Sequence, residues 1–428
     1  MQVRFIGNLK QLIEEGAKRA LLISATGTGK TYASAFAVRD VLMSDPKEAF
    51  FPETDKKRVL FLVHREQIAK QALQSFRKVF GSSVTFGLLS GNAKEMNAQF
   101  LFSTMQMMSR TEIMEQFSPE DFSYIILDEA HKTGANSYQK IMKYFNPEFW
   151  LGMTASPERM DDFDVFALFD HNIAYEIRLQ QAMEEDLLCP FHYFGITELE
   201  IEGQSPDDET GLRNFRYLVC EERVNYILEQ AAYYGHSGDR VKGLIFCSRA
   251  KEAEELSGKF NQRGLRTVFL GGDTPQATRE EMMERLTSDE REDTLDYIFT
   301  VDIFNEGVDL PEVNQVIMLR PTQSPIIFVQ QLGRGLRKAD GKEYVVILDF
   351  IGNYKNNFMI PIALSGDRSY NKDNVRRYVM EGMRVIPGSS TIHFDEISRK
   401  RIFSAIDAAN FSDLKLLKEN YKNLKYKL

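Results

Sequence analysis

The sequence predicts an α/β protein with two tandem domains, each built on a parallel sheet flanked by helices. Short apolar runs rich in β-branched residues recur through its 428 residues, and a helical pattern follows each run. The runs are too short for helices and too apolar for strands with one solvated face, so they indicate buried parallel strands. The predicted strands are Ala20–Ile23, Val59–Val63, Phe100–Phe102, Tyr124–Leu127, Phe149–Met153, Gly243–Phe246, Thr267–Leu270, Tyr297–Thr300, Gln315–Leu319 and Tyr344–Leu348.

Strand and helix alternate twice over, and the chain is too long for one hydrophobic core, so two domains are predicted. We expect the first domain over residues 1–185 and the second over 186–352, with the connection near Gln180–Pro190. A mostly helical C-terminal extension is expected over 353–428.

Three segments outside the predicted strands have a recognisable pattern. Met43–Lys57 and Glu198–Leu212 are polar and contain glycine or proline, so both are predicted to be surface loops. In Ser412–Leu428 apolar residues alternate three and four apart, which predicts an amphipathic helix. That helix either packs on the second domain or docks onto something outside this chain.

The composition is that of an ordinary globular protein, with 43% hydrophobic and 27% charged residues. No run of about 18 apolar residues exists, so a membrane span is excluded. The first residues lack the apolar region of a signal peptide, and the three cysteines are widely spaced, which together indicate the cytoplasm. The net charge of −9 means that any affinity for nucleic acid must come from a local groove.

The strongest local signal is the segment Ser24–Thr31 (SATGTGKT), which follows an apolar strand and opens a helical pattern. Glycines let the backbone wrap phosphate groups, and the N–H groups at the start of a helix attract the anion. The lysine supplies charge at the β- and γ-phosphates, and the last threonine offers its hydroxyl to Mg²⁺. Ser24 stands where glycine or alanine is usual, and it is small enough to keep the loop. The candidate phosphate-binding residues are Thr26, Gly27, Thr28, Gly29, Lys30 and Thr31.

A second signal, Asp128-Glu129-Ala130-His131, follows the predicted strand Tyr124–Leu127. Ligands of doubly wound sheets sit at the carboxyl ends of strands. There Asp128 would hold Mg²⁺ through water, and Glu129 would polarise the attacking water. The tetrapeptide alone is equally consistent with a solvated helix start, and the phosphate loop upstream favours the catalytic interpretation.

From Gln2 to about Asp349 the chain resembles superfamily 2 DEAD/DEAH-box helicases, in the branch of type I and III restriction-enzyme motor subunits and nucleotide-excision-repair helicases. The resemblance implies two RecA-like domains that hydrolyse ATP with Mg²⁺ at their interface, and nucleic acid as the partner. The restriction and repair character favours DNA over RNA. The main rival is an ATP-driven switch that clamps a protein partner without moving along nucleic acid.

The resemblance also implies a role for each residue that matches a family motif. Gln2 matches the adenine-reading glutamine, and Arg334 and Arg337 match the arginine fingers, which three apart on a helix would face the same way. Alone, Thr154-Ala155-Ser156 is no more than a strand-end turn, and Gly333-Arg334-Gly335 a solvated loop. The matches are His64, Arg65, Thr104, Arg249 and Thr300 for nucleic-acid contact; Gly307 and Asp309 for nucleotide in the second domain; and His131, Thr154, Ser156 and Gln330 for coupling hydrolysis to movement.

Two further expectations concern what lies beyond the motor. No phosphodiesterase or nuclease pattern occurs in the chain, although some relatives fuse one to the motor. Relatives carry an additional segment before the adenine-reading glutamine, whereas only Met1 precedes Gln2. We therefore expect a fragment of a longer protein, whose other domains would be partners of this motor.

Overall fold

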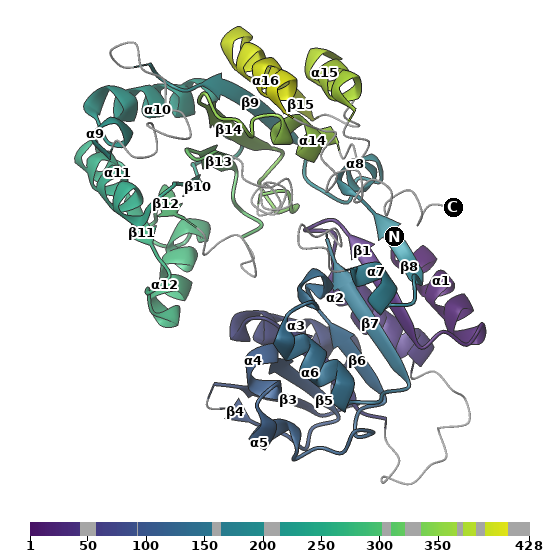
Figure 1. The fold of residues 1–428 in the computed structure, drawn as a ribbon. Helices are drawn as coiled ribbons and strands as arrows, with labels where there is room; N and C mark the ends of the chain where they lie inside the picture. The colour runs from purple at the N-terminus through teal and green to yellow at the C-terminus, as the bar shows by residue number, and fades with distance from the viewer. Residues whose placement is uncertain are drawn as a thin grey trace. The chain divides into compact units, whose positions relative to one another are not determined.

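Two parallel sheets organise the chain, which divides into the units Met1–Arg178 and Leu179–Leu428. The computed structural model describes residues 1–42, 57–91, 93–155, 164–200, 215–301, 310–321, 335–365, 371–381 and 390–409. Figure 1 shows the strands of each unit with the helices packed around them. No helix in these ranges is both long and apolar enough to cross a membrane.

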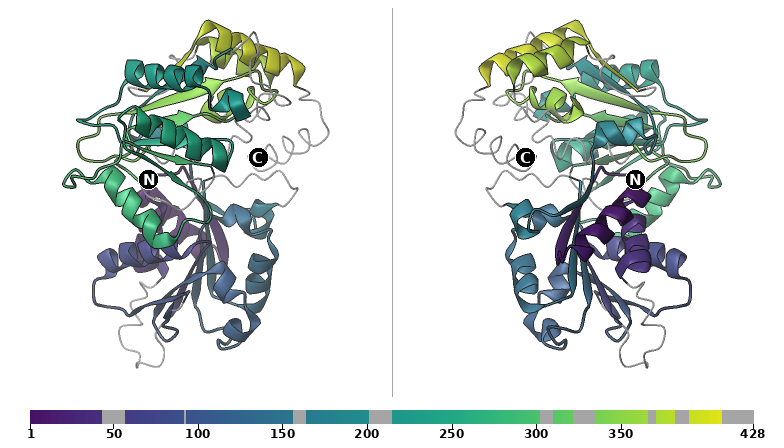
Figure 2. Two further views of the ribbon diagram at one scale, coloured as in Figure 1. Left: turned by 90° about the vertical axis from the view of Figure 1, so that its left-hand side faces the viewer. Right: turned by 90° about the vertical axis from the view of Figure 1, so that its right-hand side faces the viewer.

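The first unit has an eight-stranded sheet in the order β4-β3-β5-β2-β6-β7-β1-β8. All its pairings are parallel except that of β3 with the two-residue strand β4. Helices cover both faces of the sheet (Figure 2). The strands are β1 (Arg19–Ser24), β2 (Val59–Val63), β3 (Phe86–Ser90), β4 (Ala93–Lys94), β5 (Phe100–Thr104), β6 (Tyr124–Leu127), β7 (Phe149–Thr154) and β8 (Ile173–Ile177); the helices are α1 (Gln2–Glu14), α2 (Lys30–Ala37), α3 (Glu66–Phe80), α4 (Met105–Met108), α5 (Thr111–Met114), α6 (Asn136–Tyr144) and α7 (Val165–Leu168).

The second unit has a seven-stranded parallel sheet in the order β11-β12-β10-β13-β14-β9-β15. The strands are β9 (Phe191–Thr197), β10 (Gly243–Phe246), β11 (Thr267–Leu270), β12 (Tyr297–Thr300), β13 (Gln315–Met318), β14 (Val345–Ile351) and β15 (Thr391–Phe394); the helices are α8 (Leu179–Glu184), α9 (Phe215–Leu218), α10 (Glu221–Tyr234), α11 (Ala250–Gln262), α12 (Gln276–Thr287), α14 (Met359–Ser365), α15 (Lys372–Glu381) and α16 (Glu396–Ala408).

The predicted fold class is confirmed, and each of the ten predicted strands is present within a few residues of its expected bounds. The strands β3, β4, β8, β9 and β15 were not predicted. They lie at sheet edges or alternate buried with half-buried residues, so they lack the continuous apolar run that marks a central strand.

The segment after residue 352 differs in part from the expected helical extension. The described residues of this segment form three helices, but β15 joins the second sheet at its edge, parallel to β9. The strand has only four residues, one of them an exposed histidine, so the sequence contains no apolar run from which it could be predicted. The predicted helix Ser412–Leu428, most of the predicted loop Met43–Lys57 and residues 201–212 of the other loop lie outside the described residues.

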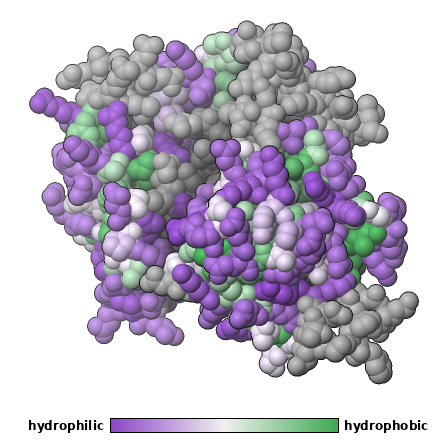
Figure 3. All heavy atoms as spheres, turned by 60° about the horizontal axis from the view of Figure 1, so that its bottom comes forward, coloured by the Kyte–Doolittle hydropathy of each residue, from purple (hydrophilic) through white to green (hydrophobic). Residues whose placement is uncertain are grey.

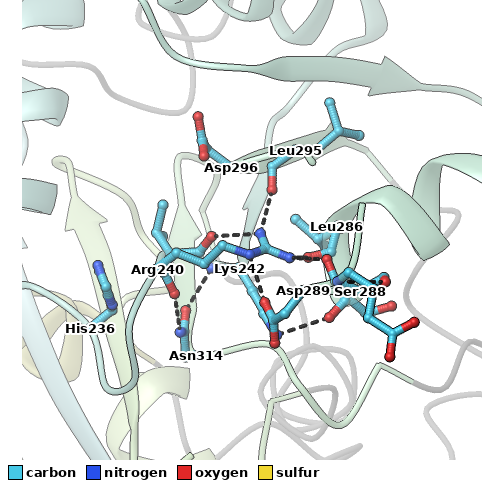
Figure 4. A network of polar contacts seen from close by, with 12 residues as sticks. His236, Arg240, Lys242, Leu286, Ser288, Asp289, Leu295, Asp296 and Asn314 are labelled. Carbon is cyan, nitrogen blue, oxygen red and sulfur yellow. Dashed lines mark hydrogen bonds and ion pairs between the residues drawn. The ribbon is translucent and has the colours of Figure 1, made fainter. Parts of the chain in front are cut away.

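Side chains cap the end of α12 and tie it to the start of β10 (Figure 4). The Arg240 guanidinium donates to the carbonyl oxygens of Leu286 at 2.7 Å, Ser288 at 2.8 Å and Leu295 at 2.9 Å. Asp289 accepts from Arg240 Nε at 2.8 Å and from Lys242 Nζ at 2.7 Å. The last carbonyl groups of a helix have no partner within it, so this network satisfies groups that burial would otherwise penalise.

A buried carboxyl group in β14 makes the stability of the second unit depend on pH. Asp349 is 2% exposed and accepts a hydrogen bond of 2.6 Å from the Tyr193 hydroxyl. Burial raises the pKa of Asp349 from 3.8 to about 7, although the bond from Tyr193 acts in the opposite direction. The folded state therefore binds a proton between pH 3.8 and about 7 that the unfolded state has released.

We expect the contribution of Asp349 to the free energy of unfolding to be fully present below pH 3.8 and lost as the pH rises to about 7. Asp349→Asn keeps an acceptor for Tyr193 and cannot ionise, so above that window it should be more stable than the wild type by up to about 4 kcal/mol. Urea unfolding of both proteins at several pH values, beside the exposed control Asp340→Asn, measures this difference. A difference that stays constant with pH would contradict it.

Candidate nucleotide and nucleic-acid sites

The predicted phosphate loop connects β1 to α2 at the carboxyl end of the sheet. Gly27 and Gly29 have φ values of 89° and 85°, a left-handed conformation that glycine adopts without steric cost. Gly29 is also the N-cap of α2, so the first N–H groups of this helix face the loop. The backbone is thus already shaped to receive an anion at the helix N-terminus.

Hydroxyl groups and one ammonium group brace this loop from within. Ser24 is fully buried, and its Oγ lies 2.5 Å from Thr28 Oγ1, which donates to the Ala25 carbonyl oxygen at 2.7 Å. Lys30 Nζ donates to the Ser24 carbonyl oxygen at 3.0 Å. Serine at position 24, unusual for such a loop, therefore has a structural role here. Thr26 and Thr31, the other predicted loop residues, are half-buried.

Two adjacent carboxylates follow β6, as predicted. Asp128 is 9% exposed, and its Oδ1 accepts the Glu129 N–H at 3.0 Å. Burial, and then the negative charge of Glu129, raise the pKa of Asp128 to about 7, while Lys30 acts in the opposite direction. Two carboxylates this close are costly to bury without a cation. Their oxygen atoms and the Thr31 hydroxyl are the ligands that Mg²⁺ prefers, so the residues fit the implied ion.

Glu129 is held in an unusual backbone conformation, with φ 52° and ψ 50°. The left-handed region is uncommon for a residue with a side chain, and such strain concentrates at functional sites. The His131 Nδ1 atom lies 3.3 Å from Glu129 Oε2 and 3.1 Å from Thr154 Oγ1. His131 thus joins the carboxylate after β6 to the end of β7, where Thr154 is fully buried.

The N-terminus lies beside the phosphate loop. Met1 Sδ is 3.6 Å from Ser24 Oγ, and α1 begins at the next residue. Gln2, the predicted adenine-reading residue, is exposed in the first turn of α1. Since β1 lies next to β7, and β7 next to β6, the loop, both carboxylates and Thr154 all belong to neighbouring strand ends.

The predicted strand-contacting residues of the first unit follow the neighbouring strands β2 and β5. His64 and Arg65 come directly after β2, and both are half-buried. Thr104 ends β5 and caps α4 by accepting the Met107 N–H at 3.3 Å. These residues therefore share the carboxyl edge of the sheet with the phosphate loop, on strands to the other side of β6.

In the second unit the predicted contacts lie at the ends of β10 and β12, which are neighbours. The Cys247 N–H donates to the Thr300 carbonyl oxygen at 2.8 Å, which ties the two ends together. The hydroxyl groups of Ser248 and Thr300 are buried and have no hydrogen-bond partner among the described residues. Arg249 is the N-cap of α11 and half-buried.

The predicted arginine fingers can be placed only in part. Arg337 lies in a bend rather than on a helix, so the expectation of two arginines on one helical face does not hold at this position. Gly335, two residues before it, lies in a turn. The preceding residue, Leu336, accepts the Cys189 N–H at 2.8 Å. Ser156, Gly307, Asp309, Gln330 and Arg334 lie outside the described residues.

Two loops at the same sheet edges were not predicted from the sequence. Ser90 ends β3 and Gly91 follows it, and Ser90 Oγ donates to Glu66 Oε2 at 3.1 Å. Gly271 and Gly272 follow β11, and Arg279 holds this turn by donating to both of their carbonyl oxygens. The glycine pair after a predicted strand was a signal that could have identified the second loop.

No group of three or more histidine, cysteine, aspartate or glutamate side chains suited to a metal ion occurs in the described part of the chain. Figure 3 shows one face of the molecule, on which polar residues predominate and apolar ones form only small patches.

Comparison with known protein families gives two matches. Residues 1–159 match the res subunit of type III restriction enzymes, and residues 222–339 match the helicase conserved C-terminal domain. The putative ATP-dependent helicase IRC3 of Saccharomyces cerevisiae is 26% identical over 83% of this chain and 52% of its own length. The EcoAI type I restriction endonuclease subunit of Escherichia coli is 25% identical over 82% of this chain and 45% of its own. The chain spans about half the length of these relatives.

Solved structures share the fold. A fragment of an HsdR subunit of a type I restriction enzyme from Vibrio vulnificus has a TM-score of 0.61 at 23% identity, over 81% of this chain and 62% of that one. The type ISP restriction-modification enzyme LlaBIII bound to DNA has a TM-score of 0.66 at 18% identity, over 95% of this chain and 32% of that one. Dbp5 of S. cerevisiae bound to RNA and ADP BeF3 has a TM-score of 0.57 at 16% identity, over 90% of this chain and 89% of that one.

Proposed function

We propose that this chain is an ATP-driven motor that moves along nucleic acid, because residues 1–159 match the res subunit of type III restriction enzymes and residues 222–339 match the helicase conserved C-terminal domain. One observation carries the proposal. The phosphate loop, the Asp128–Glu129 pair and the His131–Thr154 contact follow three neighbouring strands of one sheet, which is where such sheets bind and process nucleotides.

In this proposal the first unit binds ATP through groups that are already in place. The N–H groups around Gly27 and Gly29 and the start of α2 receive the phosphates, and Lys30 exchanges its bond with the Ser24 carbonyl for a phosphate oxygen. Asp128 and Thr31 would hold Mg²⁺, which neutralises charge on the phosphates. Glu129 orients the attacking water, and Gln2 reads the adenine.

The second unit completes the reaction in this proposal. Arg334 and Arg337 stabilise the charge that develops on the transferred phosphoryl group, and Gly307 and Asp309 contact the nucleotide. The state of the nucleotide changes the affinity for the nucleic-acid strand through four coupling residues, His131, Thr154, Ser156 and Gln330. Hydrolysis then requires residues of both units, so each cycle of closure and opening changes that grip.

We propose DNA rather than RNA as the track. Restriction-enzyme subunits predominate among the relatives named above, and the LlaBIII structure contains DNA. Dbp5 in complex with RNA shares the same fold, so the fold itself does not distinguish the two. Domains of a longer protein remain the proposed additional partners, and the cytoplasm the proposed location.

ATP turnover in the presence of different nucleic acids tests this function. Steady-state hydrolysis should rise with single- or double-stranded DNA and rise less with either form of RNA. Greater stimulation by RNA would overturn the choice of DNA. Equal turnover with and without every nucleic acid would favour the rival, an ATP-driven clamp on a protein partner.

The binding of DNA should weaken as salt is added. The chain carries a net charge of −9, so the attraction must come from a few local contacts with phosphates. Each neutralised phosphate contributes a slope of about −0.7 for single strands and about −0.9 for duplex DNA in a plot of log affinity against log salt. Titrations of labelled DNA at several salt concentrations measure this slope, and a slope of zero would contradict the proposed contacts.

A further inference from the structure

We propose that Glu252 and Arg223 are positioning residues that hold the loop Cys247–Arg249 in the conformation that contacts a phosphate backbone. The inference rests on the proposed function, because it concerns the nucleic-acid contacts of the second unit. Neither residue belongs to a motif that the sequence singled out, and neither is placed in contact with nucleic acid.

Glu252 bonds directly to the backbone of this loop. It lies three residues after Arg249, the N-cap of α11, and its Oε2 accepts the Ser248 N–H at 3.0 Å. A glutamate at this position commonly reaches back to the N–H groups before a helix. Its other oxygen, Oε1, accepts from Arg223 Nη1 at 3.1 Å. The carboxylate is fully buried, so no water competes for either bond.

Arg223 fixes Glu252 to two other elements of the second unit. Its Nε and Nη2 atoms bond to both carboxylate oxygens of Glu198, at 3.2 and 2.8 Å. Its Nη1 also donates to the Leu218 carbonyl oxygen at 2.8 Å. Arg223 and Glu198 are each 1% exposed. Glu198 was predicted to belong to a surface loop, and its burial shows that this loop begins inside the second unit.

Burying the carboxylates of Glu198 and Glu252 with the guanidinium of Arg223 costs free energy, because three charged groups lose their hydration. Burial raises the pKa of Glu252, since the charged form loses its hydration, although Arg223 acts in the opposite direction. Buried ion pairs often add no more stability than apolar side chains of the same volume. The ion pairs do fix the orientation of the side chains, because the planar guanidinium of Arg223 holds both carboxylates at set positions relative to each other.

The loop that this network holds presents groups suited to phosphate. The Ser248 N–H is already used by Glu252, whereas the Ser248 hydroxyl and the neighbouring Thr300 hydroxyl have no partner among the described residues. Arg249, the next residue, is half-buried, and its side chain makes no capping hydrogen bond to α11. Arg249 is therefore the donor of this loop that a phosphate oxygen can reach, and the two buried hydroxyl groups lie at the adjoining strand ends.

The helices that carry Arg223 and Glu252, α10 and α11, also offer a matched control. Glu221, in the first turn of α10, forms ion pairs with Lys259 of α11 and with Arg263 just after it. Glu221 is largely exposed and does not contact the loop Cys247–Arg249. Glu221→Ala therefore removes an ionic link between α10 and α11 while leaving the loop untouched.

The experiment compares wild type, Glu252→Ala, Glu252→Gln and Glu221→Ala in two measurements. The first is the affinity for a labelled single-stranded DNA, and the second is the hydrogen exchange of the Ser248 amide. Glu252→Ala should weaken DNA binding about tenfold, the equivalent of about 1.4 kcal/mol and close to the value of one hydrogen bond. It should also speed exchange at Ser248, while affinity for a fluorescent nucleotide stays as in the wild type.

Glu252→Gln keeps an oxygen that accepts the Ser248 N–H, so it should recover most of both losses. If Glu252→Ala does not fold, Glu252→Asp takes its place: its side chain is one methylene shorter, so it should lose the bond to Ser248 and show both losses. Glu221→Ala should match the wild type. Wild-type affinity and exchange in Glu252→Ala would overturn the positioning role alone, and so would an equal loss in Glu221→Ala. A wild type that binds no nucleic acid would overturn the proposed function and this role with it.

Discussion

Lys30→Ala should abolish ATP hydrolysis without unfolding the first unit. Lys30 is the first residue of α2, and its ammonium group reaches back over the loop to the Ser24 carbonyl oxygen. It is the cation of the loop itself, and its charge opposes the rise that burial and Glu129 produce in the pKa of Asp128. Removing a group aimed at developing charge costs about 10²- to 10³-fold in turnover, and here ground-state binding of the phosphates is lost as well.

Steady-state hydrolysis and fluorescent-nucleotide binding measure both effects. Lys10→Ala is the matched control, because Lys10 is exposed on α1 of the same unit and pairs only loosely with Glu14 at 3.9 Å. The control should hydrolyse and bind as the wild type does. Normal turnover in Lys30→Ala, with an unchanged melting temperature, would remove the assignment of the phosphate loop.

Arg334→Ala should lower turnover by about 10³- to 10⁵-fold, the range found for arginine fingers. In the proposed mechanism Arg334 acts on charge that appears only in the transition state, so it lowers the barrier without tightening ground-state binding. The affinity for nucleotide should therefore fall far less than in Lys30→Ala. Lysine at this position should restore little, because its point charge lacks the planar fork of arginine.

The test is hydrolysis at saturating DNA beside nucleotide binding, for Arg334→Ala, Arg334→Lys and the control Arg266→Ala. Arg266 is a half-exposed arginine of the same unit, paired with Asp296 at 3.2 Å. A surface arginine would behave like this control in both substitutions. Wild-type turnover in Arg334→Ala would mean that the second unit supplies no finger at this position.

Local sequence patterns predicted the elements whose cause is local. The run Val59–Val63 is buried at every position and forms the central strand β2, as a continuous apolar run requires. The glycines of the phosphate loop do adopt positive φ, which is the physical reason for glycine there. By contrast β9 was missed, because partly exposed His192 and Phe194 alternate with buried residues and interrupt the apolar run.

What the sequence could not reveal depends on contacts between distant residues. Glu198, Arg223 and Glu252 are 25 and 29 residues apart, and each alone is typical of a solvated surface. Only the fold brings their charges together and removes them from water. Arg337 illustrates the opposite error, since its spacing from Arg334 suggested a helical face that the turn at Gly335 does not provide.

If ATP hydrolysis moves this chain along DNA, the moving chain should displace an obstacle that is bound to the DNA. A third strand annealed to a duplex, or streptavidin on a biotinylated end of a single strand, reports movement whether or not the strands of a duplex are separated. We expect wild type to release the obstacle when ATP and Mg²⁺ are present, and Lys30→Ala to leave it in place. DNA-stimulated hydrolysis with no release of either obstacle would contradict the motor and leave the clamp as the better account.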